Sequence, residues 1–269
     1  MFKIAIIGCG NMGLTYARSF LQFNLVTEEN LLLIAKNERH KRQLRKLKLG
    51  KVVDKISRKI SDYGVIIIAV KPQDFMSITE DLKNALQPHH LVLSVMAGIT
   101  VKTIENALAH DIVVRAMPNT PSQLGMGVTG FVASTAVNIH QISIIDNLMN
   151  TTGRTVILED ESLLDAVTAL SGSGPAYFFY ILKCMIDAGI KMGLEESVAA
   201  MLAKQTMLGS FHLMNQSSKK LDELIAAVTS KGGTTEAAFS RFKEGKLGDT
   251  LMQGILTAQK RAKELSKGE

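Results

Sequence analysis

Short apolar runs alternate with amphipathic segments through the first half of the chain. The runs are rich in β-branched residues and predict strands at 3–7, 31–35, 65–70, 90–95, 112–116 and 128–133. Apolar positions that recur at helical spacing predict helices at 11–23, 39–48, 74–86, 101–109 and 139–149. Buried strands separated by helices are typical of a parallel sheet covered on both faces. The pattern therefore predicts a doubly wound α/β domain.

Beyond Leu158 the strand pattern stops and long helical patterns take over. These patterns predict helices at 175–192, 195–214 and 249–265, which would form a second, all-α domain. Segment 175–192 carries apolar residues on all its faces, so it should be buried, either inside its own domain or against a second subunit. We expect an α/β domain at residues 1–160 and a helical domain at residues 161–269.

The composition is that of a globular protein, because 46% of the residues are hydrophobic and 21% are charged. The two cysteines, Cys9 and Cys184, lie far apart and suggest no disulfide framework, so a reducing, cytoplasmic location is expected. No apolar stretch reaches the roughly 20 residues needed to cross a bilayer. The first apolar run is also too short for a signal-peptide core, and no membrane association is expected.

The net charge of +6 owes much to a basic segment at residues 36–59. No aromatic residues are interleaved with these charges, so a solvated helix face explains them best and nucleic-acid binding is not expected. The six histidines lack the spacing of metal ligands, and no metal site is expected. The His89-His90 pair follows Pro88 and is expected to lie in an exposed turn.

A glycine-rich motif, Gly8-Cys9-Gly10-Asn11-Met12-Gly13, joins the first predicted strand to the first predicted helix. This is the context in which the G-x-G-x-x-G fingerprint binds a dinucleotide. Gly8 permits a tight turn, Gly10 lets a pyrophosphate approach the backbone, and Gly13 permits close packing of helix on strand. The amides and dipole at the helix start then favour the phosphates. The motif predicts a Rossmann-type dinucleotide site.

The end of the second predicted strand bears on the choice of cofactor. Sites that prefer NAD usually place a carboxylate there for the ribose 2′-hydroxyl, whereas cations favour the 2′-phosphate of NADP. Here Lys36, Asn37, Glu38 and Arg39 follow Ala35. Lys36 and Arg39 predict a preference for NADP(H), while Glu38 leaves NAD(H) open. Lys36, Asn37 and Arg39 are the candidate cofactor-binding residues of this segment.

Three further segments have the composition of binding loops. Ala69-Val70-Lys71-Pro72 ends the third predicted strand, and ligands of open sheets bind at such carboxyl ends, although a plain strand exit fits equally well. Ser230-Lys231-Gly232-Gly233-Thr234-Thr235 precedes a predicted helix and could either turn its amides toward an anion or form a glycine turn capped by a threonine. Ser171-Gly172-Ser173-Gly174-Pro175 could start a buried helix, border an active site, or do both.

With these motifs in this order, the chain resembles the pyrroline-5-carboxylate reductase family over essentially its whole length. The matching stretches are IGCGNMG, AVKP, RAMPNTP (115–121), SGSGPAYFF (171–179) and VTSKGGTTEAAF (228–239), of which the last three are specific. The resemblance implies a Rossmann-type domain followed by a helical domain that forms an interleaved homodimer, and in some members these dimers assemble into rings. It also implies hydride transfer from NAD(P)H to the imine carbon of 1-pyrroline-5-carboxylate, giving L-proline.

The resemblance also implies roles for individual residues. Asn119 and the AVKP segment would border the nicotinamide half of the cofactor, and Ala97 and Gly98 join the candidate cofactor-binding residues. The candidate substrate-binding residues, which would hold the carboxylate, are Ser230, Gly232, Gly233, Thr234 and Thr235. Thr235 is the candidate catalytic residue, with its hydroxyl near the ring nitrogen as a hydrogen-bond orienter or proton-relay partner. A protonated imine becomes a neutral amine on hydride addition, so no stronger acid is required.

Three departures from the family pattern keep two other functions open. Lys231 stands where most members have proline, Lys183 where many have an acidic residue, and Leu224-Ile225-Ala226 where Leu-Lys-Asp is common. A hydroxyacid-type dehydrogenase would use Lys183 as its helix lysine, although the GGTT and MPNTP sequences argue against it. A reductase-like regulatory protein that binds nucleotide without turnover is the other alternative.

Overall fold

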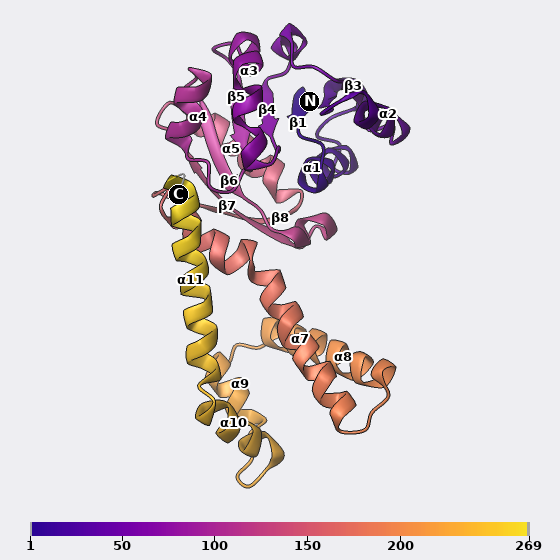
Figure 1. The fold of residues 1–269 in the computed structure, drawn as a ribbon, viewed down its shortest axis with the longest axis vertical. Helices are drawn as coiled ribbons and strands as arrows, with labels where there is room; N and C mark the ends of the chain where they lie inside the picture. The colour runs from indigo at the N-terminus through magenta and orange to yellow at the C-terminus, as the bar shows by residue number, and fades with distance from the viewer. Residues whose placement is uncertain (1, 268–269) are drawn as a thin grey trace. The chain divides into compact units, whose positions relative to one another are not determined.

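The computed structural model describes residues 2–267 and divides into two compact units (Figure 1). Unit 1 contains Met1–Ser173 and Ala258–Glu269, and unit 2 contains Gly174–Thr257. The first unit holds all the strands of the described chain, and the second consists of helices and their connections. The expected boundary between an α/β domain and a helical domain after residue 160 stays a prediction.

Unit 1 is built on an eight-stranded sheet with the strand order β3-β2-β1-β4-β5-β6-β7-β8. Its strands are β1 Ile4–Ile7, β2 Leu31–Ile34, β3 Lys51–Val53, β4 Val65–Ile68, β5 Leu91–Ser94, β6 Val113–Met117, β7 Gly127–Ala133 and β8 Gly153–Ile157. Only the β6–β7 pair is antiparallel, so β7 and β8 run against the other six strands. The predicted Rossmann-type doubly wound α/β domain is confirmed, with two reversed strands at one edge.

Two of these strands, β3 and β8, were not predicted from the sequence. They form the two edges of the sheet. None of the residues of β3 is buried, and Val156 and Ile157 of β8 remain about half exposed. A strand that is only partly covered lacks the continuous apolar run by which the inner strands were recognised. The six inner strands, by contrast, lie within two residues of their predicted bounds.

Helices cover both faces of the sheet and define two separate cores. They are α1 Asn11–Gln22, α2 Glu38–Lys46, α3 Thr79–Ala85, α4 Val101–Leu108, α5 Ile139–Asn150 and α6 Leu163–Val167. Ile4 and Ile6 of β1 join the core beneath α1 and α5, whereas Ala5 and Ile7 join the core beneath α3 and α4. Successive strand residues point to opposite faces, so a continuous apolar run supplies both cores at once.

The helix that we predicted at residues 74–86 is shorter than expected. Only Thr79–Ala85 is α-helical, and two 3-10 turns, Pro72–Asp74 and Met76–Ile78, precede it. The Ser77 hydroxyl donates to the Asp74 carbonyl at 2.7 Å, and the Thr79 hydroxyl donates to the Met76 carbonyl at 2.9 Å. Such local side-chain bonds compete with α-helical bonding and favour the tighter turns.

Unit 2 consists of helices, as predicted. They are α7 Gly174–Lys191, α8 Glu196–Gln216, α9 Leu221–Ala227, α10 Thr234–Glu244 and α11 Leu247–Lys267, whose last part belongs to unit 1. Gly189 brings α7 close to α8, because a Cβ atom there would lie 2.8 Å from the Ala199 Cβ. Among the described residues, no helix combines the length and apolar composition needed to span a bilayer.

The apolar surface of α7 is not covered within the chain. Phe179 and Tyr180 are each 69% exposed and Phe178 is 62% exposed. Burial of α7 inside its own domain, one of our two expectations, is therefore wrong. The other expectation, burial against a second subunit, is the one that fits this surface.

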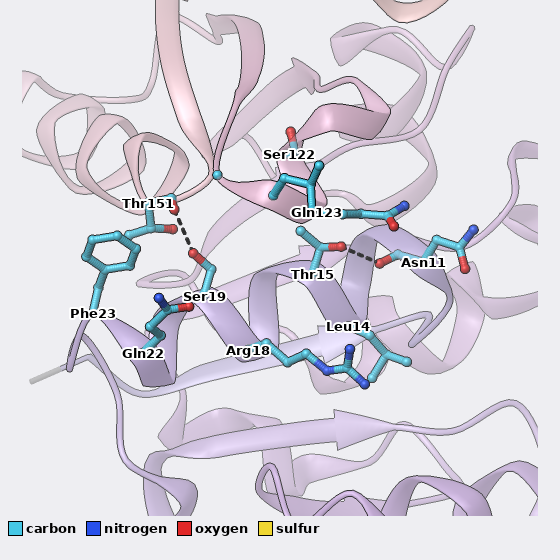
Figure 2. A pocket seen from close by; sticks show the side chains of 12 residues that line it. Asn11, Leu14, Thr15, Arg18, Ser19, Gln22, Phe23, Ser122, Gln123 and Thr151 are labelled. Atoms are coloured by element: carbon cyan, nitrogen blue, oxygen red, sulfur yellow. Dashed lines mark hydrogen bonds between the residues drawn. The ribbon is translucent and has the colours of Figure 1, made fainter. Parts of the chain in front are cut away.

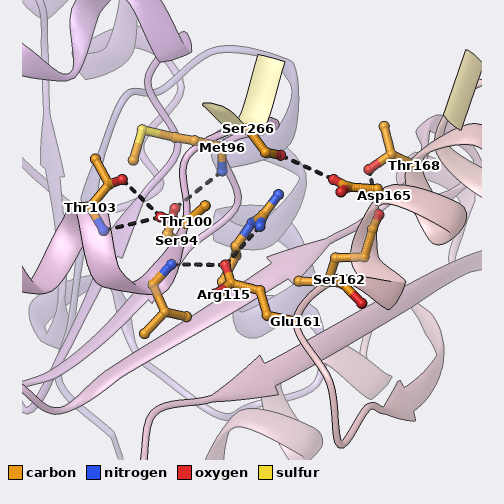
Figure 3. Close-up of polar contacts among 12 residues, drawn as sticks. Ser94, Met96, Thr100, Thr103, Arg115, Glu161, Ser162, Asp165, Thr168 and Ser266 are labelled. Atoms are coloured by element: carbon orange, nitrogen blue, oxygen red, sulfur yellow. Dashed lines mark hydrogen bonds and ion pairs between the residues drawn. The ribbon is translucent and has the colours of Figure 1, made fainter. Parts of the chain in front are cut away.

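A buried ion pair ties β6 to the helices beside it. Arg115 on β6 is 3% exposed, and its Nη1 donates to Glu161 Oε1 at 2.7 Å (Figure 3). The same carboxylate oxygen accepts the amide of Val101 at 2.8 Å, at the start of α4. Nearby, the Ser266 hydroxyl of α11 donates to the Asp165 carboxylate of α6 at 3.0 Å. These bonds fix α4, α6 and the end of α11 to one side of the sheet.

We predict that Glu161→Gln destabilises the protein by about 2 kcal/mol, because it leaves the buried Arg115 charge without a counter-charge. The cost stays below the roughly 3–5 kcal/mol of a fully buried pair, since the Glu161 side chain is 28% exposed. Denaturant unfolding measures this loss. Glu105→Gln is the matched control, because its partner Lys102 is 77% exposed. Similar losses in both variants would contradict the assigned role of Glu161.

His90 is buried, which corrects our expectation that the His89-His90 pair lies in an exposed turn. His89 is exposed, but His90 is fully buried at the start of β5, and its Nδ1 accepts the Gln87 amide at 2.9 Å. Its carbonyl oxygen also lies 2.7 Å from Nε2 of the buried His110. Burial, followed by the neighbouring His89, lowers the pKa of His90 to about 4.

We predict that the stability contribution of a neutral His90 is lost in mild acid. Since the unfolded chain binds the proton near pH 6.5 and the folded chain only near pH 4, the contribution is complete above pH 6.5 and disappears as the pH falls toward 4. The loss amounts to at most about 3 kcal/mol. His90→Asn keeps an acceptor for the Gln87 amide and should flatten the dependence of unfolding free energy on pH. His89→Asn removes only the smaller cause of the shift, so it should reduce the slope much less than His90→Asn does, and equal slopes in all three proteins would refute the assignment.

Candidate functional site

A pocket of about 860 Å³ lies where β1, β2 and β4 end. These three strands are neighbours in the sheet, with β1 in the middle. The residues that line the pocket are Ile7, Gly8, Cys9, Gly10, Ile34, Ala35, Lys36, His40, Asp54, Lys55, Ile56, Ala69, Val70, Lys71, Asp74, Ser77, Ile78 and Asp81. Ligands of open α/β sheets bind at the carboxyl ends of the strands, so this pocket is the candidate nucleotide site.

The three glycines of the motif differ in what a side chain would meet. Gly8 has a φ of +94°, and a Cβ atom there would lie 2.5 Å from backbone atoms of Ala69 and Val70. A Cβ atom on Gly13 would overlap the carbonyl oxygen of Gly8. Gly10, in contrast, has no atom within 4 Å of its missing Cβ. Gly8 and Gly13 are therefore required by the fold, whereas Gly10 leaves open space where a pyrophosphate can approach the backbone.

The helix that follows the motif is prepared for an anion. Gly10 is the N-cap of α1, and no side chain of the described residues caps it. The first amides of α1, including those of Asn11 and Met12, consequently have no partner within the helix. Together with the helix dipole they form a site that suits phosphate oxygens. These residues and Gly10 fit the dinucleotide predicted from the motif.

Cys9 ties the glycine turn to the neighbouring strand. Its Sγ lies 3.7 Å from the Ile6 carbonyl oxygen and 3.8 Å from that of Ile34. Burial raises the pKa of the thiol to about 12, so it stays protonated at neutral pH. Cys9 acts as a small packing residue beneath the turn and has no reactive thiolate.

The predicted residues after β2 divide into two groups. Lys36 lines the pocket, and its Nζ forms an ion pair with Asp74 Oδ2 at 3.1 Å. Asn37 and Arg39, in the cap and first turn of α2, do not line it. The Asn37 side chain accepts the amide of His40 at 2.9 Å and so caps α2. His40 thereby joins the pocket lining, which the sequence had not indicated.

Other predicted cofactor residues lie outside this pocket. Asn119 accepts the Val128 amide at 3.0 Å and donates to the Ser171 hydroxyl at 3.3 Å, so it connects the β6–β7 loop to the turn before α7. Gly98 has a φ of +74° and lies against Leu265 of α11. Residues of this group that line no part of the pocket are Asn11, Met12, Gly13, Pro72, Ala97, Gly98 and Asn119. Their roles toward the cofactor remain predictions.

Ser171, the partner of Asn119, lies in an irregular turn between two helices. Between α6 and α7 the chain forms a π-helical turn at Thr168–Gly172, and α7 begins at Gly174. A Cβ atom on Gly172 would lie 2.7 Å from the Met117 Cε, so the glycine permits close approach to the end of β6. Single π turns are frequent at functional sites. The SGSGP motif starts a helix, as one of its two interpretations proposed, but that helix is not buried within the chain.

The Gly-Gly-Thr-Thr loop lies in unit 2, between α9 and α10. The Gly232 amide donates to Glu236 Oε2 at 2.7 Å, and the Gly233 amide donates to the Ser230 carbonyl at 3.0 Å. The two glycine amides are thus paired within the loop and the start of α10, and their role toward the substrate carboxylate stays a prediction. A cap by either threonine is wrong, because Gly233 is the N-cap and no side chain of the described residues caps α10.

The donors of this loop come from the helix start instead. Thr234 and Thr235 occupy the first two positions of α10, whose first amides have no partner within the helix. The Thr235 hydroxyl makes no hydrogen bond within residues 2–267, and Thr235 is half-buried. An eleven-residue helix with unpaired amides and two hydroxyls at its N-terminus suits a carboxylate.

A second cavity, of about 760 Å³, is lined largely by residues of α1 (Figure 2). Asn11, Arg18 and Gln22 line it from α1, and Gln123 lines it from the β6–β7 loop. Its Ser19 hydroxyl donates to the Thr151 carbonyl at 2.8 Å, which fastens α1 to the turn after α5. Asn11, which lines this cavity, directly follows Gly10, which lines the candidate nucleotide pocket.

Comparison with known proteins agrees with this geometry. A model of pyrroline-5-carboxylate reductase dimerisation matches residues 161–265, and a model of coenzyme F420-dependent NADP oxidoreductases matches residues 3–98. The pyrroline-5-carboxylate reductase of Pseudomonas aeruginosa is 38% identical over 80% of each chain. That of Arabidopsis thaliana is 31% identical over 99% of this chain and 96% of its own. The chain belongs to the pyrroline-5-carboxylate reductase family.

Solved structures extend the similarity to the whole fold. The pyrroline-5-carboxylate reductase of Coxiella burnetii has a TM-score of 0.88 at 30% identity, with 98% of both chains covered. The pyrroline carboxylate reductase of Plasmodium falciparum, solved with NADP bound, has a TM-score of 0.87 at 25% identity and the same coverage. Membership of this NADP-dependent reductase family, inferred from five motifs, is confirmed, as are the fold class and the dimerisation region.

We predict that Gly8 and Gly10 of the glycine motif respond differently to substitution by alanine. Gly10→Ala meets no atom of the protein, so its stability should stay within about 0.5 kcal/mol of wild type. Its Kd for NADP⁺ should nevertheless rise about tenfold or more, the equivalent of ~1.4 kcal/mol. Gly8→Ala strains a positive φ and should cost about 2 kcal/mol of stability. Calorimetric titration and thermal unfolding test both variants, and normal NADP⁺ binding by Gly10→Ala would rule out the assigned pyrophosphate path.

Proposed function

We propose that the protein reduces 1-pyrroline-5-carboxylate to L-proline with NADPH, the last step of proline biosynthesis. The observation that carries this proposal is a nucleotide pocket with open space above Gly10, in a chain that matches pyrroline-5-carboxylate reductases along its length. When bound, NADPH supplies the hydride that adds to the imine carbon. A steady-state assay that follows NADPH consumption with pyrroline-5-carboxylate tests the proposal, and absence of turnover would favour a regulatory nucleotide-binding protein.

The protein's own contribution is binding and orientation. The cofactor-binding residues that we propose are Gly8, Cys9, Gly10, Asn11, Met12, Gly13, Lys36, Asn37, Arg39, Ala69, Val70, Lys71, Pro72, Ala97, Gly98 and Asn119. The substrate carboxylate is held by the 230–235 loop, chiefly by the hydroxyls and amides of Thr234 and Thr235. Alignment of the imine carbon and exclusion of water then supply most of the rate enhancement. The imine nitrogen enters protonated and leaves as a neutral amine, so Thr235 orients it without donating a full proton.

The functional form that we propose is a homodimer. The dimerisation model covers the region whose apolar helix faces are exposed in the single chain, among them those of α7 and α8. Assembly of such dimers into a ring and a cytoplasmic location are further proposals, the latter supported by the two free cysteines.

The geometry disfavours a hydroxyacid-type dehydrogenase. Lys183, its candidate lysine, is 69% exposed on α7 and forms an ion pair with Asp187 at 2.5 Å. The hydrogen bond to Asp187 raises the pKa of Lys183, which moves it away from the range of a proton acceptor. Measuring oxidation of 3-hydroxy acids beside reduction of pyrroline-5-carboxylate discriminates between the two reactions.

We predict that Thr235→Ala lowers kcat/KM for pyrroline-5-carboxylate roughly ten- to hundredfold, at or below the lower end of general acid–base effects. The affinity for NADPH should stay nearly unchanged, because the substitution removes a substrate contact. Thr235→Ser is the matched control, since it retains the hydroxyl and should recover most of the activity. Full turnover by Thr235→Ala would remove Thr235 from the mechanism.

A further inference from the structure

The candidate nucleotide pocket is lined by charges of both signs. The cationic side chains are Lys36, Lys55 and Lys71, and the carboxylates are Asp54, Asp74 and Asp81. A 2′-phosphate that enters this pocket gains from the first set and is repelled by the second. The preference for NADP(H) over NAD(H) therefore depends on which of these charges are already paired inside the protein.

Lys36 is already paired, with Asp74 at 3.1 Å. Lys36 follows β2, and Asp74 lies in the 3-10 turn after β4, so the pair connects the elements on the two sides of β1 and its glycine turn. The Lys36 side chain is 72% exposed and that of Asp74 is 35% exposed. An ion pair this open is weak, and a stronger anion can displace the carboxylate.

Asp54 is neutralised in a different way. Its carboxylate lies 3.2 Å from Nζ of Lys41, which also forms an ion pair with Glu38 at 3.1 Å. Lys41 is only 17% exposed and does not line the pocket. Its hydrogen bond lowers the pKa of Asp54, so this carboxylate stays ionised but compensated from behind. Asp54 thus forms its ion pair with a lysine outside the pocket lining, and it leaves the lysines that line the pocket unpaired by its own carboxylate.

We propose that Asp74 sets the strength of the NADP(H) preference by competing with the 2′-phosphate for Lys36. The proposal rests on the assignment of this pocket to the cofactor's adenosine half. NAD(H) has no 2′-phosphate, so Lys36 stays paired with Asp74 when NAD(H) binds. The ion pair therefore neither strengthens nor weakens the binding of NAD(H). With NADP(H), the gain at Lys36 is reduced by the loss of the Asp74 pair. Asp74 is therefore a specificity-determining residue that moderates the preference.

The experiment is a double-mutant cycle read by calorimetric binding of NADP⁺ and NAD⁺ to the full chain. Asp74→Asn keeps the side-chain shape but releases Lys36, so it should lower the Kd for NADP⁺ roughly two- to fivefold, the scale of an exposed ion pair. The Kd for NAD⁺ should not change. Lys36→Met should weaken the binding of NADP⁺ alone, and adding Asp74→Asn to Lys36→Met should improve that binding no more than Asp81→Asn does in the same background.

Asp81→Asn is the matched control, because Asp81 lines the same pocket and forms no ion pair within the described residues. Removing this charge can act only through the general field, so any gain it gives must persist in the Lys36→Met background. A gain from Asp74→Asn that persists undiminished in the Lys36→Met background, or a weaker NADP⁺ complex in Asp74→Asn, overturns the proposal. If Lys36→Met leaves NADP⁺ binding unchanged, the assignment of the pocket itself fails, so the two failures are distinguishable.

Discussion

The contact between the Gly8 turn and the end of β4 is the constraint on which the nucleotide pocket depends. The turn lies so close to the backbone of Ala69 and Val70 that no side chain fits between them, and Gly13 is packed equally closely against Gly8. These contacts fix where α1 begins relative to the strand ends. The unpaired amides of α1 and the open space at Gly10 are useful to a phosphate only because that position is fixed. Two glycines thus build the site, and the third admits the ligand.

The sequence predicted the inner part of the fold well because burial leaves a direct pattern. Strands such as β1 and β4 are covered on both faces, so all four of their residues are apolar and buried. The edge strands β3 and β8 lack this requirement and carry no recognisable run. The error at residues 74–86 has a similar origin, because the bonding of Ser77 and Thr79 to nearby carbonyls is not visible in hydrophobic spacing. Local pattern identifies burial but not hydrogen-bond partners.

The candidate site was predictable as a set of motifs but not as a set of contacts. The glycine motif, Lys36 and the AVKP segment come together because their strands are neighbours in the sheet. The partner of Lys36 is 38 residues away in the chain and the partner of Arg115 is 46 residues away, so these pairings follow from the strand order alone. Asn37 shows the opposite limit, since a residue type suited to a ligand serves here as a helix cap. Residue types suggested cofactor binding, and the arrangement of strands and helices decided which of these side chains are free to contact a cofactor.

The same distinction applies to the Gly-Gly-Thr-Thr loop. Its glycines look like anion-binding residues, yet their amides are bound to Glu236 and Ser230 within the loop. The positive φ of Gly232 explains why glycine is needed there, and Gly233 permits the close approach of the Ser230 side chain. The glycines therefore shape the turn, and the free donors belong to Thr234, Thr235 and the start of α10. Because Glu236 holds the turn closed from within α10, the helix start is formed before any carboxylate arrives, and little ordering remains to oppose binding.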